Sequence, residues 1–167
     1  DQRICDAEID RSAKFEQKQL STIRQCYAQA EYFDTYFNDL STILEGGHEK
    51  LVDLNVNLIE WFCQKLGLDA TFVRSSNLEA GGDKADLLVN ICQEVGADRY
   101  LSPPGSQAYL DAQNPFPAKG IDLVYQDYPH PVYRQLFGEF VPYLSVLDLM
   151  MNEGSGSLNL LRQKATL

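Results

Sequence analysis

Hydroxyl side chains, glycine and lysine occupy short polar segments where a phosphate or carboxylate group could bind. They are Ser75, Ser76, Lys84, Ser102, Gly105 and Ser106. Free backbone N–H groups at helix starts favour anions, and small residues let an anion come close. Ordinary helix capping explains the same residue types, because Ser, Asp and Gly commonly begin helices. Neither serine segment has the spacing of a P-loop or of a dinucleotide-binding motif, so both interpretations stay open.

His130 is the candidate for proton transfer. It stands between two prolines after an expected strand, and an imidazole ordinarily exchanges its proton near neutral pH. The flanking prolines are also typical of a rigid turn without a catalytic role. The other histidine, His48, follows two glycines and is expected in a solvated loop.

Asp148 and Lys18 are the other candidate catalytic residues. Asp148 lies in an otherwise apolar stretch, residues 144–151, and an aspartate is rarely buried without a partner. We therefore expect either a buried carboxylate that meets Lys18, Lys84 or the backbone N–H groups of residues 102–106, or an exposed one on the wet side of a helix. Both lysines are candidates for binding a substrate anion, and a solvated helix face explains them as well.

The elements that must position these residues include several helices. Apolar residues at helical spacing predict six of them outside the central part of the chain. They cover residues 14–29, 32–44, 49–66, 133–140, 143–152 and 158–163. A short strand is predicted over residues 4–9, ahead of the first helix.

Strands and helices alternate in the central part of the chain. Short apolar runs predict strands over residues 70–74, 99–101 and 121–126, joined by helices over residues 83–95 and 106–111. Connections this short are typical of parallel strands with right-handed crossovers. The predicted fold class is α/β, with a short parallel sheet and crossover helices, preceded by a helical segment and followed by C-terminal helices. Since ligands bind at the carboxyl ends of such strands, we expect the serine segments to converge on one pocket there.

The composition excludes several classes of partner. The chain has 167 residues, with 14 Lys and Arg against 24 Asp and Glu, so its net charge of −10 opposes binding to nucleic acid. The longest apolar stretch, residues 140–151, is too short and too polar to span a membrane. We expect one domain over residues 1–167 and a cytoplasmic location.

The four cysteines are predicted to be structural. Cys5, Cys26, Cys63 and Cys92 are widely spaced and have no close histidine, which argues against a zinc site. Their apolar neighbours indicate free thiols buried on the apolar faces of their elements, and free thiols are typical of the cytoplasm.

Seven groups of residues, taken in order, resemble one family. They are residues 18–23 with Tyr27 and 32–33, residues 54–55 with 58–59, residues 72–78, residues 96–97 with 100–102 and 109–110, residues 120–121, residues 128–133, and residues 144–149 with Asn152 and Gly154. In this order they resemble the WbqC-like protein family, and the resemblance covers nearly the whole chain. Family members usually begin with a further segment, so we expect a chain truncated at its N-terminus.

The resemblance implies a bacterial enzyme of O-antigen or lipopolysaccharide biosynthesis that transfers an acyl or aminoacyl group, such as glycine, to an amino sugar. The substrate would then be an anionic small molecule such as a nucleotide-linked sugar, and Tyr109 and Tyr133 would join the substrate-binding residues. The histidine that usually follows the lysine of the first helix is Gln19 here. If that histidine is catalytic in the family, this chain is either impaired or uses another base, such as His130. The sequence identifies no cofactor and no oligomeric state.

Two other classes of function fit the sequence. A binding module without turnover is favoured because no nucleophile and base form a convincing pair. A nucleotidyltransferase is suggested only by the predicted parallel architecture, and fold-level analogy is weak support for a function.

Overall fold

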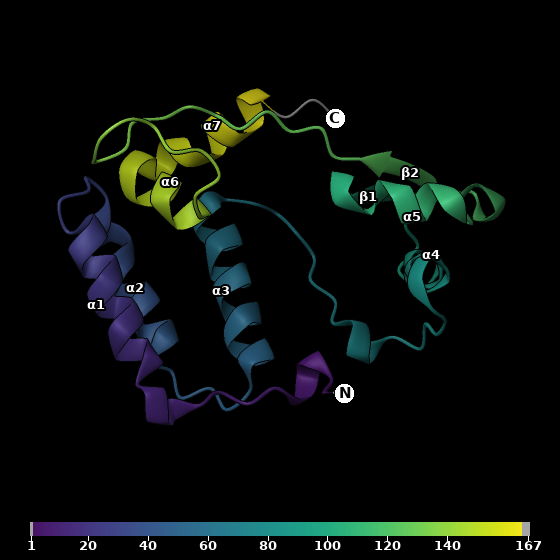
Figure 1. Ribbon diagram of the computed structural model, residues 1–167, viewed down its shortest axis with the longest axis horizontal. Helices are drawn as coiled ribbons and strands as arrows, with labels where there is room; N and C mark the ends of the chain where they lie inside the picture. Colours follow the sequence, from purple (N-terminus) through teal and green to yellow (C-terminus); the bar gives the residue numbers. More distant parts are fainter. Residues whose placement is uncertain (1, 165–167) are drawn as a thin grey trace. The chain divides into compact units, whose positions relative to one another are not determined.

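A computed structural model describes residues 2–164 of the chain (Figure 1). The chain separates into two compact units. The helical unit comprises residues 2–70 together with His130–Lys164, and the sheet unit comprises Thr71–Pro129. The expectation of a single domain stays a prediction.

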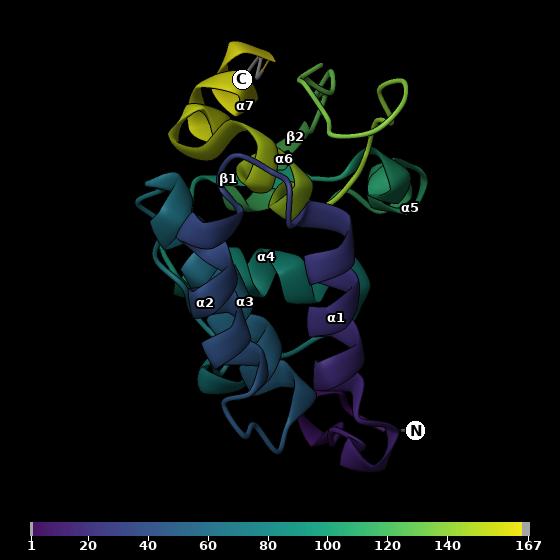
Figure 2. The same cartoon turned by 90° about the vertical axis from the view of Figure 1, so that its left-hand side faces the viewer.

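Five α-helices build the helical unit, and Figure 2 shows the first three running alongside one another. They are α1 (Phe15–Tyr27), α2 (Phe33–Leu44), α3 (Leu51–Leu66), α6 (Val146–Glu153) and α7 (Ser157–Lys164). The central helix is α2, because it packs against α1, α3 and α6. Its buried residues recur at helical spacing and face the core: Phe33, Tyr36, Phe37, Leu40 and Leu44.

Residues from α3 and α6 complete this core. Leu54 and Trp61 of α3 and Met150 and Met151 of α6 are buried against the apolar face of α2. A backbone hydrogen bond from Tyr32 N to Met151 O, 3.1 Å long, joins the start of α2 to α6. The segments before and after the sheet unit therefore share one core.

Gly154 follows α6 in a backbone conformation that requires glycine. Its φ is 53°, and a Cβ atom there would lie 2.3 Å from the ring of Tyr32. The Tyr32 ring can thus approach the backbone closely only because Gly154 has no side chain.

The sheet unit holds a two-stranded parallel sheet. Strands β1 (Arg99–Ser102) and β2 (Asp122–Tyr125) pair in register and are joined through α5 (Gln107–Ala112), while α4 (Lys84–Glu94) precedes them. The buried core of this unit comprises Ala85, Val89, Cys92, Leu110, Phe116 and Ile121. The predicted α/β class, with a short parallel sheet, a crossover helix and helices before and after it, is confirmed.

Two predicted strands are wrong. Residues 70–74 form no strand: Phe72 and Val73 are exposed and run into the 3₁₀ turn η3 (Ser75–Asn77). Residues 4–9 form the 3₁₀ turn η1 (Ile4–Asp6) and a single antiparallel bridge from Glu8 to Lys50. Both runs have strand-like composition, but neither has a strand alongside it with which to form a ladder.

The predicted helix over residues 133–140 is also wrong. This segment has no regular structure, because the side chain of Gln135 binds the backbone instead: its Nε2 donates to Val141 O at 3.0 Å, and its Oε1 accepts from Val141 N at 2.8 Å. Gly138 adopts φ 64°, which a helix does not permit. The next helix, α6, begins at Val146, because the Ser145 hydroxyl caps it by accepting from Leu147 N.

The cysteine prediction holds in part. All four cysteines are free, but Cys5 and Cys26 are exposed, Cys63 is half-buried and only Cys92 is buried. Cys26 is exposed because α1 packs against the core through other positions, the partly buried Leu20, Ile23 and Tyr27.

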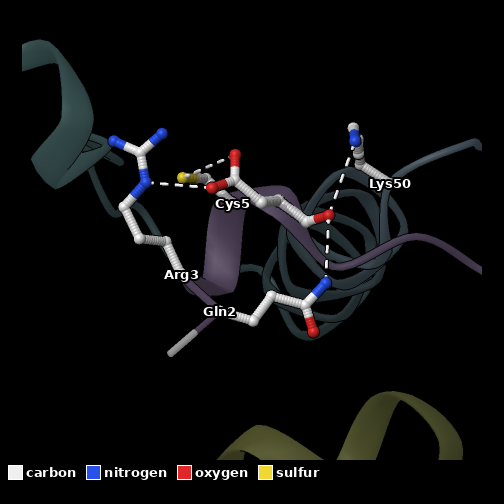
Figure 3. A network of polar contacts seen from close by, with 5 residues as sticks. Gln2, Arg3, Cys5 and Lys50 are labelled. Atoms are coloured by element: carbon white, nitrogen blue, oxygen red, sulfur yellow. Dashed lines mark hydrogen bonds and ion pairs between the residues drawn. The ribbon is translucent and has the colours of Figure 1, made fainter.

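A polar network at the start of the chain centres on Asp6 (Figure 3). The Arg3 guanidinium donates to its carboxylate at 2.9 Å and lowers the pKa of Asp6, while Gln2 and Lys50 donate to its backbone carbonyl. The Cys5 thiol also lies against this carboxylate. Because these groups are mostly exposed, the network contributes little to stability and fastens the first turn to the start of α3.

Across residues 2–164, no helix combines the length and the apolar character that crossing a bilayer requires.

Candidate functional site

A buried carboxylate in the helical unit is the centre of the candidate site. Asp148 lies in the first turn of α6 and is 5% exposed. Its Oδ1 accepts a hydrogen bond from Tyr27 Oη at 2.9 Å, and its Oδ2 accepts from Tyr133 Oη at 2.8 Å and from Gln135 Nε2 at 3.0 Å. The carboxylate therefore joins the end of α1, the irregular segment after His130 and the start of α6.

All three donors to Asp148 are neutral side chains. Burial and, second, the hydrogen bond to Asp148 raise the pKa of Tyr133 to about 12. The same two causes, in the same order, raise the pKa of Tyr27 well above its usual range. Both phenols hence keep their protons near neutral pH and act as donors, and the N-terminal end of α6 adds a favourable dipole for a negative charge.

The imidazole of His130 lies beside this network. Its ring centroid is 6.2 Å from that of Tyr133, 5.8 Å from that of Phe140 and 5.1 Å from that of Tyr143. Its Nδ1 is 2.7 Å from Pro131 O. Since a carbonyl oxygen carries no proton, Nδ1–H is the donor, and the neutral ring presents an unprotonated Nε2 that can accept a proton.

A second group of polar side chains lies at the carboxyl end of the sheet in the sheet unit. Ser106 Oγ donates to Pro103 O at 2.7 Å, so it accepts the proton of Ser102 Oγ, with which it also bonds. Ser102 ends β1, is 1% exposed and pairs in register with Tyr125. The Tyr125 hydroxyl donates to Asp111 Oδ1 at 2.6 Å, and burial together with that bond raises the pKa of Tyr125 to about 12.

Comparison with known proteins decides the family of this chain. Residues 1–160 match the sequence model of the WbqC-like protein family. The chain belongs to the WbqC-like protein family. Among curated proteins, the uncharacterized protein Rv1507c of Mycobacterium tuberculosis is 33% identical over 138 residues, which cover 81% of this chain and 59% of that relative. No solved structure matches this chain.

The WbqC-like chain confirms one of the two expectations for Asp148, namely a buried carboxylate with partners. The expected partner within the same unit, Lys18, is wrong: across residues 2–70 and 130–164 the donors to the Asp148 carboxylate are two phenols and an amide. Lys84 and residues 102–106 belong to the sheet unit, and their expected contact with Asp148 stays a prediction. Lys18 is exposed on α1, nine positions before Tyr27, which corresponds to about 13.5 Å along the helix axis.

The sequence predicts one pocket formed by both serine segments at one edge of the sheet. The part of this prediction that concerns Ser75 and Ser76 is wrong. Ser75 and Ser76 are exposed in η3 and follow no strand, whereas Ser102 and Ser106 bond to each other at the end of β1. Their separate roles in binding a substrate stay predictions.

The other predicted binding residues of this WbqC-like chain occupy different places. Lys84 is the exposed first residue of α4, and Gly105 and Tyr109 are exposed near the end of β1. Tyr133 is buried in the helical unit, where it binds Asp148. Their proposed roles in substrate binding also stay predictions.

Sequence reasoning missed two donors of this family member. Tyr27 lies in the helix predicted over residues 14–29 and Gln135 in the predicted helix that does not form, and neither is a predicted site residue, yet both bind Asp148. A buried Asp148 needs hydrogen-bond donors, and this need is the only feature of the sequence that points to residues such as Tyr27. No local pattern identifies which residues the donors are. Among the described residues, no three His, Cys, Asp or Glu side chains are grouped to hold a metal ion.

Proposed function

We propose that this WbqC-like chain is a small-molecule group-transfer enzyme that moves an acyl or aminoacyl group to the amine of an amino sugar in surface-polysaccharide biosynthesis. The observation that carries the proposal is the buried Asp148, whose partner Tyr133 contacts the ring of His130. Burying a carboxylate costs several kcal/mol, which its three hydrogen bonds offset. Buried ionisable groups held by specific partners cluster at functional sites.

His130 is the proposed proton-transfer residue. In the reaction the amine nitrogen attacks the acyl carbonyl carbon, a C–N bond forms, and the bond from that carbon to the donor's leaving group breaks. The amine loses one proton, which His130 Nε2 accepts and returns to the leaving group. The hydrogen bond from Nδ1 to Pro131 O supports this role, because it leaves Nε2 as the basic nitrogen.

Asp148 is a positioning residue in this proposal. Its carboxylate binds Tyr27, Tyr133 and Gln135, so its hydrogen-bonding capacity is directed at protein groups. Through Tyr133 it positions one of the aromatic rings that lie beside the imidazole. A fixed imidazole is an advantage in proton transfer, since small displacements of a catalytic group lower rates strongly.

The proposed function is tested by incubating the chain with coenzyme A thioesters or aminoacyl donors and nucleotide-linked amino sugars, with mass spectrometry of the sugar. An acylated amine is the expected product. His130→Gln should lower its rate of formation by about 100-fold or more, while the matched variant His48→Gln leaves the rate unchanged. Product formation at the wild-type rate by His130→Gln contradicts the role of His130, and no transfer from any donor contradicts the function.

A further inference from the structure

An open groove between α1 and α2 is not used by the proposed function. The two helices pack together in the helical unit, and the groove between them has a volume of about 460 Å³. That volume lies within the range of small-molecule sites. A second cavity of about 330 Å³ shares Gln17 and Glu45 with it and continues the groove towards Lys14.

The groove contains a fixed and unpaired guanidinium group. Arg24 lies with its guanidinium carbon 4.5 Å from the centre of the Phe37 ring and 5.9 Å from that of Phe33. The two phenylalanine rings are themselves stacked, with centroids 4.5 Å apart. Among the described residues no carboxylate forms an ion pair with Arg24, so its N–H donors stay available while its position is set. A guanidinium held over an aromatic ring keeps the planar fork that suits bidentate binding of an oxyanion.

Neutral polar side chains line the rest of the groove. Gln17 and Ser21 come from α1 and Asn38 from α2, while an acidic residue of the lining, Glu45, directly follows α2. Amides and hydroxyls both donate and accept hydrogen bonds, which matches a ligand with several hydroxyl groups. Leu20 and Phe37 form an apolar part of the lining, against which the C–H face of such a ligand can pack.

The local charge also favours an anion. Arg11, Lys14 and Arg24 are the cations of the two cavities, and Glu16 and Glu45 are the acids. Three positive and two negative groups give a local balance of +1, in a chain whose net charge is −10. Arg11 is paired with Glu16 at 3.5 Å, so the excess positive charge of the two cavities rests on Lys14 and Arg24 against Glu45.

We propose that the α1–α2 groove binds a hydroxylated small molecule that carries one oxyanion group, a phosphate or a carboxylate, with the oxyanion on Arg24. The hydroxylated body extends along the groove past Ser21 and Asn38 towards Gln17. Binding here involves no chemical step and does not depend on the proposed transfer reaction.

Isothermal titration calorimetry of the chain at low salt tests the site with four probes: glucose 6-phosphate, gluconate, glucose and inorganic phosphate. We expect glucose 6-phosphate or gluconate to bind at least tenfold more tightly than glucose or inorganic phosphate, because only these two offer both the oxyanion and the body. The charged probe that binds more tightly identifies the oxyanion. The proposal is overturned if neither glucose 6-phosphate nor gluconate binds, or if all four probes bind with equal affinity.

Matched variants separate the two parts of the site. Arg24→Gln should weaken binding of the charged probe at least tenfold, and Arg24→Lys, which keeps the charge but loses the planar fork, should weaken it less. Arg162→Gln removes an exposed arginine of α7 and should leave affinity unchanged. Equal affinities of Arg24→Gln and Arg162→Gln for the charged probe overturn the assignment, provided that both variants melt near the wild-type temperature.

Asn38→Ala tests the binding of the hydroxylated body. This change leaves Arg24 over Phe37, so it should weaken glucose 6-phosphate several-fold and leave inorganic phosphate unaffected. A parallel loss for both probes contradicts the placement of the body along the groove.

Discussion

Replacing Asp148 by alanine should strongly destabilise the chain. The change removes the acceptor of three hydrogen bonds of 2.8 to 3.0 Å. Tyr133 is 8% exposed, so its hydroxyl loses its partner without reaching water. Gln135 Nε2 keeps its bond to Val141 O, and the half-buried Tyr27 hydroxyl can turn to solvent.

The expected change in the free energy of unfolding follows from what happens to each of the three donors. One fully buried donor left without an acceptor costs about 1–3 kcal/mol, and the loss of a charge-assisted bond at a second donor adds about 1 kcal/mol. We therefore expect Asp148→Ala to lower the free energy of unfolding by about 2–4 kcal/mol. Asp148→Asn should cost about 1–2 kcal/mol, since its amide oxygen still accepts from Tyr133 and Gln135 while its NH₂ faces a hydroxyl that can rotate.

Urea unfolding followed by circular dichroism measures these differences. The matched control is Asp111→Asn, which alters an exposed aspartate that also accepts from a tyrosine hydroxyl and should have a much smaller effect. The expected order of destabilisation is Asp148→Ala, then Asp148→Asn, then Asp111→Asn. An Asp148→Ala variant within about 0.5 kcal/mol of the wild type, the usual range of a surface change, would refute the reasoning.

Two further perturbations have expected outcomes. Gly154→Ala should lower the free energy of unfolding by about 3 kcal/mol or more, because its Cβ would meet the Tyr32 ring at 2.3 Å. Gly156→Ala, which has open space around it, should be nearly neutral in the same urea assay. Equal effects of the two substitutions would contradict the steric argument. The pKa of Tyr133 is about 12 in the folded chain and about 10 when unfolded, so its stabilising contribution is complete below pH 10 and is lost as the pH rises towards 12. Thermal melts from pH 9 to 12 should therefore fall less steeply for Tyr133→Phe than for the wild type, and identical slopes would count against this titration.

Periodic elements could be predicted from the sequence, because their signals are local. The helix expected over residues 32–44 carries five apolar residues at helical spacing and forms as Phe33–Leu44. The strands expected over residues 99–101 and 121–126 form as Arg99–Ser102 and Asp122–Tyr125. Each element contributes residues to a core, and the face that it turns towards the core is the one on which the sequence places its apolar residues.

The errors arise where a distant partner or a side chain decides the structure. An apolar run such as residues 70–74 becomes a strand only beside another strand, and none pairs with it. The segment over residues 133–140 has apolar residues at helical spacing, but the amide of Gln135 competes for the backbone of Val141.

The candidate site could be predicted only in part. The cost of an unpartnered carboxylate correctly predicted that a buried Asp148 must have donors. It could not say which donors, because Tyr27 is 121 residues away in the chain and the contact depends on the packing of α1 near α6. His130 and its aromatic neighbours lie close in sequence, but the irregular backbone between them sets their ring contacts.

The division of the helical unit into two chain segments has a consequence for the order of folding. Its core needs Met150 and Met151, which a ribosome makes only after all of Thr71–Pro129, while the sheet unit draws its core from one continuous stretch. Helices α1, α2 and α3 must therefore wait, with an apolar face uncovered, until α6 leaves the exit tunnel. The sheet unit can complete its own core during that interval, because domains fold as units during synthesis. The closing of the loop between residues 70 and 130 then becomes a late step, and its entropic cost is lower once the intervening segment is already compact.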